Sequence, residues 1–185
     1  MKKIDMRFDS NLFKTFIGKP FRKYRCDEFI YTSSVTQIVG FYIGDEIFKM
    51  TNILEPTDYY GVKEDIAICK FNFCEEPEIK SAFVDGRLTD SPINGIINQI
   101  KMINEHQQVF TNNTLEYDVW LTRGIIFSVD GRELSFEKDV VPFSEEINIR
   151  KGYELIDSFG KEDGFVEGWD ENIRAQVERE LITIE

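Results

Sequence analysis

Histidine and cysteine, the residues that most often bind zinc, are scarce in this chain of 185 residues. There is one histidine, His106, and there are three cysteines, Cys26, Cys69 and Cys74. A structural zinc site usually combines two closely spaced ligand pairs, and only Cys69 and Cys74 could form such a pair. The composition therefore predicts no metal and no cofactor. An odd number of cysteines also favours free thiols in a reducing compartment, so we expect a cytoplasmic protein.

Long apolar segments are absent as well. A membrane-spanning helix needs about 20 consecutive apolar residues, and no segment of the sequence approaches that length. Lys2 and Lys3 could begin a signal peptide, but Asp5, Arg7 and Asp9 interrupt the apolar stretch that would have to follow. The sequence predicts neither a membrane segment nor an export signal.

Recognisable catalytic motifs are missing too, since neither a phosphate-binding loop nor a Gly-x-Ser-x-Gly elbow occurs. The best catalytic candidate is His106, a natural general base. Glu105 or Asp118 could orient its ring, and Arg123 could stabilise an anion. No nucleophile lies at a recognised spacing from His106, so the sequence favours a structural role for it.

The net charge of −12 is unevenly distributed. Residues 1–25 contain eight Lys and Arg against two Asp, a net +6, so the other 160 residues carry −18. Aromatic residues interrupt the basic ones, a pattern also found in nucleic-acid-binding arms. However, the acidic remainder would repel phosphates within a Debye length of about 8–10 Å. We therefore expect this basic arm to pack on the acidic body, and we disfavour nucleic acid as a partner.

The strongest structural signal lies in residues 117–138. Two runs of β-branched and aromatic residues flank Asp130-Gly131, a dipeptide suited to the positive φ angles of a tight hairpin turn. The chain also contains 16 Phe, 7 Tyr and 2 Trp, and aromatic residues favour strands. We predict an α+β fold that is predominantly antiparallel β, either barrel-like or a rolled sheet, with one or two short helices.

We expect a single domain over residues 1–185, because no linker or low-complexity segment divides the chain. A short helix after Asp9-Ser10 should belong to the basic arm, and residues 35–141 should form the antiparallel core. A second hairpin is expected around Gly44-Asp45, and Asp85-Gly86 is a further turn signal.

Three later segments are harder to assign. Residues 93–103 carry isoleucines at both helical and strand spacing, and the neighbouring hairpins favour a strand. Residues 149–159 are expected to form a short helix. Residues 172–185 also fit both periods, and their β-branched end favours a closing strand.

Acidic pairs recur along the chain, and most are expected to be solvated turns. A body of this charge would speed its encounter with a basic partner by roughly 10- to 1000-fold at low salt. The first hypothesis is therefore a non-enzymatic acidic protein that binds a basic macromolecule, as an inhibitor, an immunity protein or a nucleic-acid mimic does. The predicted contact residues are Glu75, Glu76, Glu78 and Trp169.

Two alternatives belong to other classes. The second hypothesis is a β-barrel that binds a small ligand, with Trp120 and Phe127 lining the pocket. The third is an enzyme that uses His106 and a nearby carboxylate. The sequence leaves the oligomeric state and the identity of any partner open.

Overall fold

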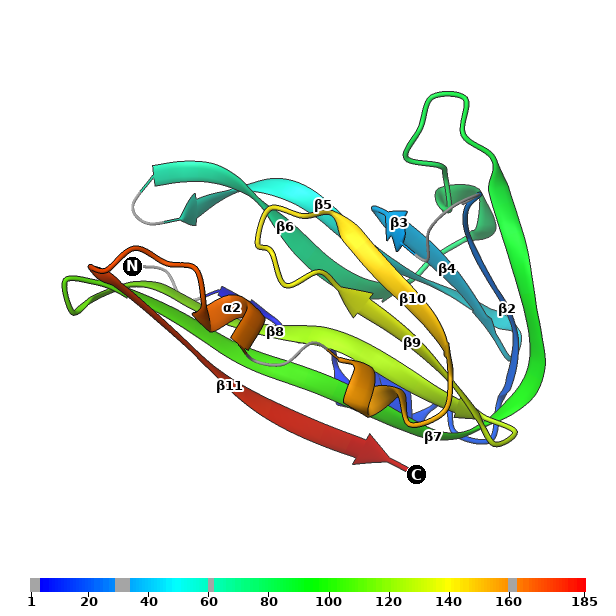
Figure 1. Ribbon diagram of the computed structural model, residues 1–185. Coiled ribbons are helices and arrows are strands. Elements are labelled where there is room, and N and C mark those ends of the chain that lie inside the picture. Colours follow the sequence, from blue (N-terminus) through cyan, green and yellow to red (C-terminus); the bar gives the residue numbers. More distant parts are fainter. Residues whose placement is uncertain (1–3, 29–33, 60–61, 160–162) are drawn as a thin grey trace.

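The computed structural model describes residues 4–28, 34–59, 62–159 and 163–185, and it is mostly antiparallel β-sheet (Figure 1). The elements are β1 (Ile4–Met6), α1 (Ser10–Lys14), β2 (Pro20–Asp27), β3 (Ser34–Thr36), β4 (Ile38–Ile43), β5 (Glu46–Tyr59), β6 (Val62–Phe73), the 3-10 turn η1 (Glu76–Glu78), β7 (Leu88–Thr111), β8 (Thr114–Val129), β9 (Arg132–Lys138), β10 (Glu146–Gly152), the 3-10 turn η2 (Leu155–Ser158), α2 (Asp163–Val166) and β11 (Ile173–Ile184). Nine strands follow the order β3-β10-β9-β8-β7-β2-β4-β5-β6. In addition, β1 pairs with β8 in parallel and β11 pairs with β7.

Strand β7, which has 24 residues, belongs to both halves of this sheet. Residues 88–96 pair with β2, whereas residues 97–111 pair with β8. Between these two parts the strand is irregular, because Asn94 has a positive φ of 54° and the register with β8 shifts after Ile97. The two halves therefore face each other across a shared interior (Figure 1).

Aromatic side chains fill this interior. Phe41 from one half lies 4.6 Å from Phe136 and 6.0 Å from Phe127 of the other half, measured between ring centroids. Helix α1 adds Phe13 and Phe16, which are both fully buried. Fully burying one such side chain contributes about 1.5–3 kcal/mol, so this aromatic core is a main source of stability.

The predicted hairpins form at Asp130-Gly131, between β8 and β9, and at Gly44-Asp45, between β4 and β5. Asp130 and Gly131 have φ angles of 48° and 79°, as a tight type I′ turn requires. Asp85-Gly86 does not join two strands. It lies in a projecting loop between η1 and β7, in which Gly86 N donates to Phe83 O at 3.1 Å.

Residues 93–103 lie within β7, which is irregular at Asn94, and residues 173–184 form β11. The expected helix over residues 149–159 is wrong. Residues 149–152 continue β10, because Ile147 and Ile149 alternate into the core with strand period. Within residues 149–159, only Leu155–Ser158 is helical. It forms a single 3-10 turn after Glu154, whose φ is positive.

The expected predominance of antiparallel β is confirmed, but a barrel is not, because the sheet is not closed. The loop after β9 approaches the strands at the far end of the sheet, where Pro142 O accepts from Ala67 N at 2.9 Å and Ser144 O accepts from Asn52 Nδ2 at 2.9 Å. These are isolated contacts and not a strand ladder. None of the helices among the described residues is long and apolar enough to cross a membrane.

The basic arm packs on the rest of the chain over its described part, which excludes Lys2 and Lys3. Lys19 pairs with Glu46 at 2.8 Å, and Lys23 and Arg25 both pair with Asp90, at 2.6 and 2.5 Å. Its aromatic residues are all buried: Phe8, Phe13, Phe16, Phe21 and Tyr24. The rings that could have stacked on bases are therefore part of the core.

The close packing of β8 on β9 can be tested at Gly124. A Cβ atom at this position would lie 2.6 Å from the ring of Phe159 and 2.8 Å from the Phe136 carbonyl oxygen, which is held in a strand. We expect Gly124→Ala to lower the free energy of unfolding by about 1–3 kcal/mol because of overpacking. Denaturant unfolding measures the loss. Gly152→Ala is the control, since its nearest neighbour would lie 3.3 Å away, and an equal loss in both variants would contradict this account.

Candidate functional site

His106, the proposed general base, lies on β7 opposite Trp120 of β8. Its Nε2 atom is 2.6 Å from Oδ1 of Asp118, so Asp118 is the carboxylate that orients the ring. The imidazole stacks on the Trp120 indole at 4.5 Å with an interplanar angle of 8°. Arg7 lies 4.6 Å from the same indole and comes from the β1 side of β8, away from β7. Trp120 is therefore held between an imidazole and a guanidinium.

This arrangement gives His106 a fixed position but no reaction partner. No hydroxyl or thiol of the described residues forms a hydrogen bond with its ring. The cysteines are poor nucleophiles, because burial raises the pKa of Cys26 to about 11 and that of Cys69 to about 12. A thiol becomes strongly nucleophilic only as the thiolate. The geometry is that of a cross-strand pair that stabilises the sheet.

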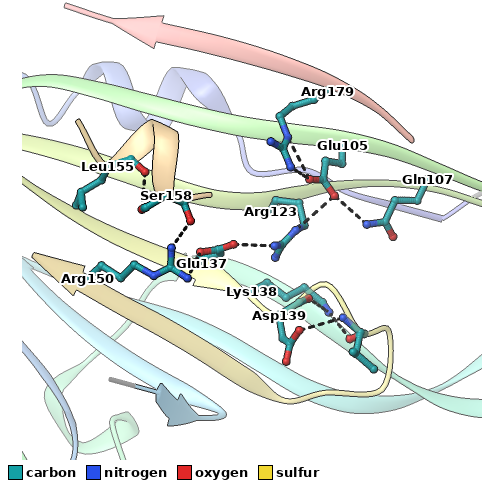
Figure 2. Close-up of polar contacts among 11 residues, drawn as sticks. Glu105, Gln107, Arg123, Glu137, Lys138, Asp139, Arg150, Leu155, Ser158 and Arg179 are labelled. Carbon is teal, nitrogen blue, oxygen red and sulfur yellow. Dashed lines mark hydrogen bonds and ion pairs between the residues drawn. The ribbon is translucent and has the colours of Figure 1, made fainter. Parts of the chain in front are cut away.

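Glu105 and Arg123, the other catalytic candidates, belong to a separate network (Figure 2). Five side chains of alternating charge cross five neighbouring strands: Arg179 of β11, Glu105 of β7, Arg123 of β8, Glu137 of β9 and Arg150 of β10. The successive ion pairs measure 2.7, 3.4, 2.7 and 3.6 Å. We call these five residues the charge ladder.

A break in strand register accompanies the ladder. Ile103 pairs with Gly124 and Asn104 pairs with Thr122, so Arg123 is an extra residue that forms a β-bulge. A bulge can redirect a side chain from the alternation of its strand. The Arg123 side chain is only 4% exposed, and the carboxylates of Glu105 and Glu137 flank it.

The centre of the ladder is incompletely hydrogen-bonded. Among the described residues, Nε and Nη1 of Arg123 and Oε2 of Glu137 have no hydrogen-bond partner. Longer ion-pair contacts remain for two of these atoms, Nε with Glu105 at 3.4 Å and Oε2 with Arg150 at 3.6 Å. Burying charge is costly unless the groups are both paired and hydrogen-bonded. The ladder therefore joins side chains of five strands and adds little net stability.

Lys138, next to the ladder on β9, is also buried. Its Nζ atom donates to the carbonyl oxygens of Asp139 at 3.1 Å and Val141 at 3.3 Å. Burial lowers the pKa of Lys138 to about 8. The side chain thus anchors the loop after β9, but it carries a large desolvation cost when it is protonated.

The predicted acidic contact residues of η1 are already occupied by other parts of the chain. Glu76 pairs with Arg25 at 2.6 Å, and Glu78 pairs with Lys49 at 2.6 Å. These side-chain hydrogen bonds lower the pKa of both carboxyl groups. Glu75 caps the turn through a reciprocal capping box with Glu78. Two of these three charges are therefore neutralised within the protein.

Trp169 lies in a different setting, an acidic strap formed by residues 163–171. The strap contains Asp163, Glu167, Asp170 and Glu171 and no lysine or arginine. Glu167, Asp170 and Glu171 are exposed, and no ion pair joins them to any described residue.

Aromatic contacts hold the strap on the sheet. Phe165 is buried, and its ring lies 6.2 Å from that of Tyr117 on β8. Trp169 packs edge-on against Phe165, and its Nε1 donates to the Phe165 carbonyl oxygen at 2.7 Å. Trp169 is therefore half-buried, and Val166, which lies between Phe165 and Trp169 in the sequence, is 41% exposed. The strap thus carries exposed carboxylates next to a partly exposed apolar residue.

The described residues contain no group of three or more His, Cys, Asp or Glu that could hold a metal ion. The sequence analysis predicts Trp169 as a contact residue but not the acidic residues around it. The available signal was a run of nine residues with four carboxylates and no basic residue. Comparison of the chain with protein-family models, with curated proteins and with solved structures finds no match.

The charge ladder makes a prediction about stability. Arg123→Met would leave two buried carboxylates facing an apolar side chain, and we expect it to lower the free energy of unfolding by about 3–5 kcal/mol. Arg150→Met is the control, since Arg150 is 37% exposed at the end of the ladder, and it should cost about 1 kcal/mol or less. Denaturant unfolding compares the two. Adding Glu137→Gln to Arg123→Met should recover part of the loss, and equal costs for the two Arg variants would refute the account.

The lowered pKa of Lys138 predicts how the free energy of unfolding depends on pH. Its folded-state pKa of about 8 lies below the ordinary value of 10.5, so between these pH values the unfolded chain binds more protons than the folded one. Stability therefore increases as the pH rises through this window, by an amount on the order of 3 kcal/mol at about 1.4 kcal/mol per pKa unit. The difference in unfolding free energy between wild type and Lys138→Met, measured from pH 7 to 10.5, isolates this effect. Lys63→Met, an exposed control, should run parallel to wild type, and parallel curves for Lys138→Met would show the assignment to be wrong.

Proposed function

We propose that this chain is a non-enzymatic binding protein that docks a basic protein through the acidic strap. The observation that carries the proposal is that Glu167, Asp170 and Glu171 are exposed and unpaired within the described part of the chain. Two of the acidic contacts predicted from sequence, Glu76 and Glu78, are instead neutralised by Arg25 and Lys49. The strap therefore has carboxylates available for an external cation.

Two further properties support this choice. Phe165 and Trp169 hold the strap in place. The strap therefore does not have to become ordered when a partner binds, and this lowers the entropic cost of association. It also carries the exposed Val166 and the partly exposed Trp169 beside its carboxylates, and protein interfaces combine apolar with polar surface. The net charge of −12 would attract a basic partner from a distance.

The kind of partner follows from the same charges. A basic protein, such as the target of an inhibitor or immunity protein, matches the strap, whereas a nucleic acid would be repelled. The small-ligand hypothesis in its original form has less support, because Phe127 is in the core and Trp120 lies between His106 and Arg7. The catalytic hypothesis has less support because no hydroxyl or thiol within the described ranges forms a hydrogen bond with the His106 ring.

A triple neutralisation tests the strap. We expect Glu167→Gln/Asp170→Asn/Glu171→Gln to reduce the association rate with the basic partner by about tenfold or more at low salt, since steering by charge contributes roughly 10- to 1000-fold. The partner would first be captured from a lysate of the source cells by the wild-type chain at low salt. Association would then be followed by stopped-flow fluorescence of Trp169 in a Trp120→Phe background, at low and high salt.

The matched control is Asp58→Asn/Glu64→Gln/Asp65→Asn, which makes the same change in net charge near the tip of the β5–β6 hairpin. It should slow association much less than the strap variant. An equal effect of both triple variants would show that the total charge acts and not the strap. Capture of a basic protein whose association rate does not depend on salt would contradict the proposal.

A further inference from the structure

A surface cavity of about 530 Å³ lies where β7 passes from one half of the sheet to the other. The turn of the β8–β9 hairpin and the end of β10 form its other walls. The lining residues are Pro92, Ile93, Val129, Asp130, Arg132, Glu133, Leu134, Lys151, Gly152 and Tyr153. Its volume falls within the range of about 300–1,000 Å³ that is typical of small-molecule sites.

The two acidic residues of the lining are engaged by the protein itself. Glu133 accepts from Lys101 Nζ at 2.9 Å and from the backbone N of Leu155 at 2.6 Å. The carboxylate of Asp130 packs against Gly95, where a Cβ would lie 2.5 Å from Oδ2, and Oδ1 faces the backbone N of Ile96 at 3.4 Å. Both carboxylates therefore form hydrogen bonds within the protein that stabilise the walls of the cavity.

The two basic residues of the lining have no such partners. Arg132 and Lys151 are exposed, and neither forms an ion pair with another described residue. The Nζ atom of Lys151 lies 5.1 Å from the ring centroid of Tyr24, a cation–π contact that leaves its hydrogen-bond donors available. The cavity therefore carries two cations that are available to a ligand, although the net charge of the chain is −12.

The remaining lining is apolar. Val129 and Leu134 are buried in the core and form part of the wall. Tyr153 is 68% exposed and is followed by Glu154, whose positive φ of 54° turns the chain away from β10. An aromatic ring in this position offers a flat surface on which a planar molecule can stack.

We infer that this cavity binds a small organic anion with a planar apolar body, in which a phosphate or carboxylate group contacts Arg132 and Lys151. The apolar body lies against Val129 and Leu134 and stacks on Tyr153. Arginine suits both anions, because its planar donors can bind two oxygens at once. The inference is independent of the acidic strap, since it involves other residues and a ligand of opposite charge.

Titration of the 15N-labelled full chain with phenyl phosphate and with benzoate, followed by amide NMR shifts, tests this inference. Saturable shifts are expected at Gly131 and Gly152. Benzylamine, which carries the opposite charge, should cause none, and inorganic phosphate should bind at least fivefold more weakly than phenyl phosphate. The tighter of the two aromatic anions identifies whether the site prefers phosphate or carboxylate.

Variants at the cations make the test specific. Arg132→Gln/Lys151→Gln should weaken binding of the preferred anion at least tenfold, while its amide spectrum away from the cavity stays that of the wild type. Lys63→Gln/Lys80→Gln, with the same change in net charge at exposed positions elsewhere in the sequence, should leave the affinity unchanged. Equal binding of benzylamine, unchanged affinity in the cavity variant, or no saturable shift with either aromatic anion would overturn the inference.

Discussion

A single strand that serves two half-sheets is the constraint on which the rest of this structure depends. Residues 88–96 of β7 pair with β2, and residues 97–111 pair with β8 and β11, so one continuous strand connects the two halves. The bend brings Phe41 against Phe127 and Phe136 and creates the aromatic core. It also places the cavity at the join, because strands that part at a bend leave space between them. The cavity and the aromatic core therefore both result from the bend in β7.

Local turn chemistry made much of the sheet predictable from sequence. Asp130-Gly131 and Gly44-Asp45 each join two strands as expected, since the positive φ angles that these residues tolerate are a local property. Asp85-Gly86 carries the same signal but lies in a projecting loop, because its flanking residues have no mutual partner strand. The spacing of Tyr153, Ile156 and Phe159 favours a helix over residues 149–159. Residues 149–152 form a strand instead, because they pair with β9, a tertiary contact that local sequence does not show.

The charged residues proposed for binding were harder to predict, because pairing between residues far apart in sequence decides which charged side chains are left without an ion pair. Glu76 and Glu171 both belong to acidic stretches, and nothing local distinguishes them. Glu76 finds Arg25, 51 residues away in sequence, whereas Glu171 finds no described ion-pair partner. In the sequence, Arg123 likewise resembles an ordinary strand residue. Only the register shift between β7 and β8 shows that it lies at a bulge and is buried. The outcome is a protein that presents free carboxylates on one element and free cations on another.

The terminal strands have a mechanical consequence. β1 runs parallel to β8, and β11 runs antiparallel to β7, which is itself antiparallel to β8, so β1 and β11 point in the same direction. A pull between Ile4 and Ile184 would act on the central hairpin from opposite ends (Figure 1). Such a load shears the ladder of β11 along its whole length and cannot open it one hydrogen bond at a time. Because the same pull acts on β1, the shorter ladder of three residue pairs between β1 and β8 limits the resistance of the molecule to extension.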